Sequence, residues 1–199
     1  MEGGPSGNDL RNIFDPHQGD LRKRIITAEK YSGVDEMDIF LYYRGYGEWI
    51  KGKPLLIPKD AKITRHVTKY PLEQLVSNLS LLSVLGNIRT ITIFLDITYI
   101  NPKKSAGSIW DFPDLPDKIC ILSAASNGET SQVYKEKKHS IFTYALLKGL
   151  AGGADDGDNP YVAWRRAASH LFVTTDSINM MNECAASHAL VSLLAKDFI

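Results

Sequence analysis

The sequence predicts an α/β protein with a mostly parallel β-sheet flanked by helices. Residues 37–43 and 91–99 are two apolar runs of strand length, rich in β-branched and aromatic side chains. Between them, residues 71–85 carry apolar side chains at near-helical spacing, with Pro71 at the start and Gly86 at the end. A strand, a crossover helix and a second strand in this order form a parallel, right-handed unit. We therefore expect the two strands to have their carboxyl ends at the same edge.

The elements before this unit follow from caps and composition. Residues 1–19 open with Gly, Ser and Pro, and are predicted to be a flexible, irregular segment ahead of a domain over residues 20–199. Asp20 is expected to cap a helix that continues to about Tyr31. Residues 54–58 are long enough for only a small strand.

The elements after the unit follow the same reasoning. Residues 118–125 predict a buried strand, and Ser140 is expected to cap a helix over residues 141–150. Pro160 is expected to begin a further helix that ends near residue 173. Residues 188–194 predict a last strand.

Polar residues follow both strands of the central unit. Asp96 and Thr98 lie at the end of residues 91–99, and Tyr46 stands between Gly45 and Gly47 after residues 37–43. Ligands of parallel sheets bind at the carboxyl ends of the strands. We expect the two glycines to turn the chain sharply, so that Tyr46 faces Thr98 at this edge.

These motifs resemble the caspase and metacaspase superfamily of cysteine peptidases. That family places its general base His between two glycines after one strand, and its nucleophilic Cys two residues after an Asp at the end of the next. This chain keeps both glycines and Asp96 but has Tyr46 at the His position and Thr98 at the Cys position. Residues 55–60, 123–131 and 140–147 extend the resemblance in order and spacing, so that it runs from about residue 37 to the end.

The resemblance implies a caspase-like fold from which the first strands are missing. Family members carry two strands and a helix ahead of the His-bearing strand, whereas 36 residues precede Met37 here. Those strands lie beside the His-bearing strand, so residues 38–43 are expected to form an open sheet edge. We expect that the chain is a fragment of a longer protein, or that another chain covers this edge.

The resemblance also implies a site that lacks the two side chains needed for peptide hydrolysis. An unperturbed tyrosine hydroxyl has a pKa near ~10 and a threonine hydroxyl is not meaningfully acidic, so neither replaces an imidazole or a thiol. No catalytic residue is therefore predicted. The backbone of Gly47 and Thr98 corresponds to an oxyanion hole, and a vestigial pocket for a basic side chain corresponds to Asp96, Asn127 and Glu129.

The predicted function is that of an inactive peptidase homologue that binds or regulates another protein. The partner is either an active relative or a second copy, paired through the last strand as the family pairs its domains. The alternative is an active endopeptidase that cleaves after Arg or Lys with an unusual residue set. That alternative would need a relocated base among the five histidines, His17, His66, His139, His170 and His188. A nucleotide-binding module is disfavoured because the chain has no glycine-rich phosphate loop.

Composition limits the remaining classes of function. The 199 residues carry a formal net charge of zero, which favours neither nucleic acid nor a membrane surface as partner. The acidic run at residues 155–158 lacks the spaced ligands of a calcium loop, so no metal and no cofactor are predicted. Two distant cysteines and the lack of a signal-like or transmembrane-length apolar run predict a cytoplasmic protein.

Overall fold

The computed structural model describes residues 4–32, 36–62, 68–85, 87–100, 115–124, 133–134 and 139–148. The chain divides into two compact units, one of Met1–Thr130 with Val191–Ile199, and one of Ser131–Leu190. The predicted elements over residues 160–173 and 188–194 lie outside the described residues, as do Asn127 and Glu129.

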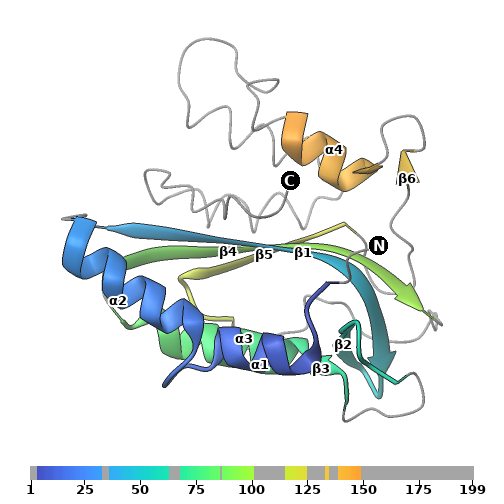
Figure 1. Ribbon diagram of the computed structural model, residues 1–199. Helices are drawn as coiled ribbons and strands as arrows, with labels where there is room; N and C mark the ends of the chain where they lie inside the picture. Colours follow the sequence, from blue (N-terminus) through green and yellow to red (C-terminus); the bar gives the residue numbers. More distant parts are fainter. Residues whose placement is uncertain are drawn as a thin grey trace. The chain divides into compact units, whose positions relative to one another are not determined.

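The first unit is built on a mixed, mostly parallel five-stranded sheet, as its sequence predicts (Figure 1). The strand order is β3-β2-β1-β4-β5, and the three strands β1, β4 and β5 run parallel to one another. The strands are β1 (Met37–Ile50), β2 (Lys53–Ile57), β3 (Tyr70–Pro71), β4 (Ile88–Ile100) and β5 (Ile119–Ser123). The helices of this unit are α1 (Gly7–Phe14), α2 (Asp20–Ser32) and α3 (Leu72–Ser83).

Figure 1 shows these three helices on the same side of the sheet. The core lies between the two layers, because alternate side chains of a strand point to one face and the helices bury their apolar sides against it. The helix α3 connects β3 to β4, so the predicted crossover between parallel strands is confirmed. The shared core includes Leu10 of α1, Ile25 of α2, Leu79 of α3, and Ile91 and Ile93 of β4.

The segment over residues 1–19, expected to be irregular, contains the helix α1; the sequence leaves residues 10–14 open between the end of a helix and a short loop, and the structure shows the helix. Ser6 caps this helix, since its Oγ accepts a hydrogen bond from the backbone N–H of Asp9 (3.1 Å) while Asp9 Oδ2 accepts one from the N–H of Ser6 (2.8 Å). Asp60, in the loop after β2, accepts a further hydrogen bond from the N–H of Gly7 (2.7 Å). The Gly- and Pro-rich start of the chain is therefore followed by a helix that its cap and Asp60 hold in place.

The strand β1 is twice as long as predicted. It continues through Gly45 and Gly47 to Ile50 and turns at Lys51 and Gly52, whose φ angles are 52° and 78°. Positive φ at both central residues is the geometry of a type I′ hairpin, which here joins β1 to β2. The predicted sharp turn at Gly45–Gly47 is thus displaced to residues 51–52.

The part of β1 that pairs with β2 is limited to Tyr46–Ile50. Among the described residues, no strand lies beside Met37–Gly45 on the edge away from β4. The expectation that the first strands of a caspase-like fold are missing stays a prediction. The second unit contributes β6 (Val133–Tyr134), β7 (His139–Ser140) and α4 (Ile141–Lys148). Ser140 caps α4 as predicted, because its Oγ accepts a hydrogen bond from the N–H of Thr143 (2.9 Å).

Candidate functional site at the carboxyl ends of β1 and β4

The two residues that the resemblance aligns with the family's His and Cys, Tyr46 and Thr98, lie side by side. Tyr46 of β1 is the register partner of Thr98 of β4 in a continuous parallel ladder, so the predicted juxtaposition is confirmed. Tyr46 is exposed and Thr98 is half-buried. A phenol and a secondary alcohol therefore share one face of the sheet near the carboxyl ends of the strands. Neither group is a general base near neutral pH, and the pair has no ready nucleophile.

The glycines beside Tyr46 provide close packing rather than a turn. A Cβ atom on Gly47 would lie 2.6 Å from Ile97 Cγ2 and 2.9 Å from the ring of Tyr99. A Cβ on Gly45 would lie 2.8 Å from the hydroxyl oxygen of Tyr43. A side chain at position 47 would therefore displace Ile97 or Tyr99, and one at position 45 would displace the hydroxyl end of Tyr43, so the two glycines allow close packing within an extended strand. The oxyanion-hole role of the Gly47 and Thr98 backbone stays a prediction, since both residues lie inside paired strands.

Asp96 is buried at the same end of the sheet and has partners from β1. Its side chain is 2% exposed, and its Oδ2 lies 3.6 Å from Nε of Arg44 and accepts a hydrogen bond from the hydroxyl of Tyr42 (3.3 Å). Arg44 and Asp96 are also register partners. The carboxylate to which the resemblance assigns a pocket role therefore lies beside a cation of its own chain, which the resemblance does not imply.

Sequence reasoning missed Arg44 and Tyr42 as members of this site. The available signal was strand alternation, which places Tyr42, Arg44 and Tyr46 on one face of β1 because they are two residues apart. The predicted strand ended at residue 43, ahead of the expected turn at Gly45, so the alternation was not extended to Arg44 and Tyr46. Of the five histidines, the structure describes His17, in the turn after α1, and His139, in β7 of the second unit. Neither of these two lies on β1 or β4.

Tyr43 and Tyr99 occupy the other face, toward the helices. The hydroxyl of Tyr43 donates a hydrogen bond to the carbonyl of Ile57 (3.3 Å), and burial raises the pKa of Tyr43 to about 12. Burial also raises the pKa of Tyr99, whose hydroxyl has no hydrogen-bond partner among the described residues. The side chains of Tyr43 and Tyr99 therefore belong to the core and not to the candidate site formed by Tyr46 and Thr98.

We expect Tyr43 to resist ionisation in the folded protein. Its folded-state pKa of about 12 lies above the unfolded value of about 10. The folded state therefore holds the proton more tightly, and this contribution to stability is full below pH 10 and is lost as pH rises through 12. Titration of absorbance at 295 nm should show a late tyrosinate step that Tyr43→Phe removes. Identical curves above pH 11 for the two proteins would contradict this assignment.

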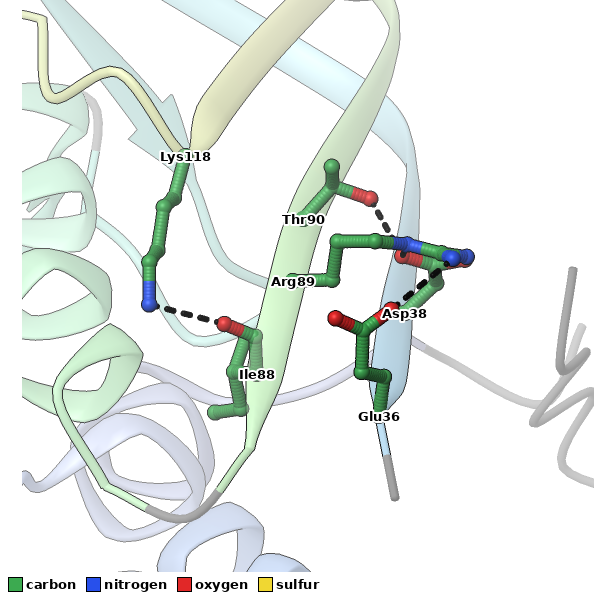
Figure 2. Close-up of polar contacts among 6 residues, drawn as sticks. All are labelled: Glu36, Asp38, Ile88, Arg89, Thr90 and Lys118. Carbon is green, nitrogen blue, oxygen red and sulfur yellow. Dashed lines mark hydrogen bonds and ion pairs between the residues drawn. The ribbon is translucent and has the colours of Figure 1, made fainter. Parts of the chain in front are cut away.

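A second polar cluster lies at the opposite, amino ends of the strands (Figure 2). Arg89 donates a hydrogen bond from Nε to Asp38 Oδ1 (3.0 Å), forms an ion pair between Nη2 and Asp38 Oδ2, and reaches Glu36 through Nη1 (3.2 Å). Thr90 donates its hydroxyl to Asp38 Oδ1 (2.7 Å). Burial raises the pKa of Asp38, against the lowering effects of Thr90 and Arg89. This cluster ties β1 to β4 rather than forming an edge site.

Lys118 closes the same end of the sheet. Its Nζ donates to the carbonyls of Ile88 (2.8 Å) and Ser83 (3.3 Å), so it links the start of β5 to the start of β4 and the end of α3. Among the described residues, no group of three or more His, Cys, Asp or Glu side chains could hold a metal ion. No helix in the described part of the chain is long and apolar enough to cross a bilayer.

Comparison with known proteins finds no family model that matches the chain and no curated protein that matches it.

Proposed function

We propose that this chain is a caspase-like peptidase homologue that has no peptidase activity and acts as a protein-binding or regulatory module. The observation that carries the proposal is the pairing of Tyr46 with Thr98 across two neighbouring parallel strands. These are the positions to which the resemblance assigns the His base and the Cys nucleophile. Replacing both members of a catalytic unit leaves only the background rate from binding and the oxyanion hole.

The state of Asp96 also supports a loss of peptidase function. A peptidase that cleaves after Arg or Lys would need this carboxylate for the substrate cation. Here Asp96 is buried and lies beside the guanidinium of Arg44, so a substrate cation would have to displace a side chain of the same protein. The proposed partner is another protein, either an active relative or a second copy. We propose the cytoplasm as the setting, since two cysteines form no disulfide framework.

The test is an assay of the full chain against fluorogenic peptides that end in Arg or Lys, with and without a cysteine-reactive inhibitor. We expect no hydrolysis above the buffer rate, and no difference between the wild type and Thr98→Val, a close match in shape without the hydroxyl. Turnover that Thr98→Val or Asp96→Asn abolishes would establish the endopeptidase alternative instead.

A further inference from the structure

Three side chains form an exposed stripe on β1, which we call the β1 stripe: Tyr42, Arg44 and Tyr46. Strand alternation places them on one face, while Leu41 and Tyr43 pack against the core on the other. Tyr42 is 47% exposed, the Arg44 side chain 44% and Tyr46 59%. Tyr and Arg are among the residue types that most often carry binding energy at protein interfaces. Two exposed tyrosines on either side of an arginine thus point to a binding surface.

A buried carboxylate holds the stripe in place. Oδ2 of Asp96 accepts a hydrogen bond from the hydroxyl of Tyr42 and lies 3.6 Å from Nε of Arg44. The Arg44 side chain is 44% exposed, so its guanidinium lies partly at the surface of the protein. The carboxylate of Asp96 lies on the same face of the sheet as the stripe but is buried, whereas the guanidinium of Arg44 is partly exposed to a ligand. A positioned guanidinium loses less conformational freedom on binding than a free one.

We propose that the β1 stripe binds an extended segment of another protein that carries an Asp or Glu side chain. This inference rests on the proposed binding function and names the chemistry of the partner. The carboxylate accepts two parallel hydrogen bonds from Nη1 and Nη2 of Arg44, the fork geometry that suits a carboxylate. The rings of Tyr42 and Tyr46 contact the neighbouring apolar side chains and exclude water from the ion pair. The stripe runs over five residues of β1, from Tyr42 to Tyr46, and is roughly 13 Å long, which matches about five residues of an extended peptide.

Charge decides between this partner and two others. A basic side chain would need the carboxylate of Asp96, which is 2% exposed and faces Arg44 instead. A single-stranded nucleic acid would stack on the tyrosines, but such ligands are held by a groove with many cations, and the whole chain has a formal net charge of zero. The exposed guanidinium of Arg44 and the burial of the Asp96 carboxylate therefore favour a partner that supplies a single carboxylate.

The test is selection of a phage-displayed random hexapeptide library on the full chain, followed by fluorescence polarisation with the selected peptides. We expect Asp or Glu to be enriched at one position, and replacement of that residue by Asn or Gln to weaken binding roughly tenfold or more. Arg44→Gln should weaken it to a similar degree. Because Arg44→Gln removes the guanidinium beside the buried Asp96, the double variant Arg44→Gln, Asp96→Asn provides a charge-matched second measurement. The matched control is Lys23→Gln, which removes an exposed, ion-paired cation of α2 and should bind as the wild type does.

Each other outcome overturns the inference. These outcomes are no selection, enrichment of Lys or Arg, full binding by both Arg44 variants, or tighter binding of an oligothymidine than of the acidic peptides. Hydrolysis of the fluorogenic substrates by the wild type would defeat the proposed function itself. An inert chain that selects no acidic peptide would defeat only the inference about the stripe.

Discussion

Replacing Arg89 by Met is expected to lower the free energy of unfolding by about 3–5 kcal/mol at pH 7. Arg89 pairs with Asp38, which is 8% exposed, so the substitution leaves a carboxylate largely buried without its cation. This is a large fraction of the stability of an ordinary domain. Urea unfolding followed by circular dichroism measures the change.

The pH dependence of this loss of stability gives an independent check of the ion-pair explanation. Burial already raises the pKa of Asp38, and removing Arg89 takes away one of the effects that lower it. A carboxyl group whose folded pKa lies above its unfolded value binds a proton more tightly in the folded state, so stability recovers as pH falls through that pKa. We expect a smaller deficit near pH 4 than at pH 7. The double variant Arg89→Met, Asp38→Asn should recover much of the loss at pH 7; an equal loss in both variants would contradict the ion-pair explanation.

Replacing Tyr46 by His together with Thr98 by Cys is expected to create a reactive thiol. An imidazole beside a thiol lowers the thiol pKa, and a change from about 8.5 to about 7 raises the thiolate fraction at pH 7 from a few per cent to about half. Alkylation by iodoacetamide at position 98 should therefore be roughly tenfold faster than in Thr98→Cys alone. Peptide mapping by mass spectrometry separates this position from Cys120 and Cys184.

The matched control is Tyr46→Phe with Thr98→Cys, which keeps an aromatic ring at position 46 and supplies no base. Its alkylation rate should equal that of Thr98→Cys alone. Hydrolysis of Arg- or Lys-containing peptides by the His and Cys double variant would further support the ancestry that the motifs suggest. Equal alkylation rates in all three variants would show that positions 46 and 98 do not form a base and nucleophile pair.

The central unit of the fold was predictable because its signals are local. The apolar runs of β1 and β4 and the helical spacing of α3 predict a parallel pair with a crossover, and that topology places Tyr46 opposite Thr98. The capping role of Ser140 was predictable for the same reason.

The misses involve contacts between distant residues. Gly45 and Gly47 looked like a turn, but their role depends on Tyr43, Ile97 and Tyr99, which pack where a Cβ would be. The helix α1 was hidden by its Gly- and Pro-rich start, and part of its stabilisation comes from Asp60, more than fifty residues later. The contact between Arg44 and Asp96 depends on strand register, which composition does not reveal.

The most direct test of the account is a cross-link between the two substituted positions. Paired residues of neighbouring strands are about 5 Å apart, within the Cα separation of about 4.4–6.8 Å that a disulfide needs. Tyr46→Cys with Thr98→Cys should form an intrachain disulfide on mild oxidation, identified by peptide mapping. Tyr46→Cys with Thr92→Cys, six residues earlier on β4 and roughly 20 Å away, should form none. A disulfide in the second variant but not in the first would show that the Tyr46 and Thr98 positions are not neighbours, and would contradict the account.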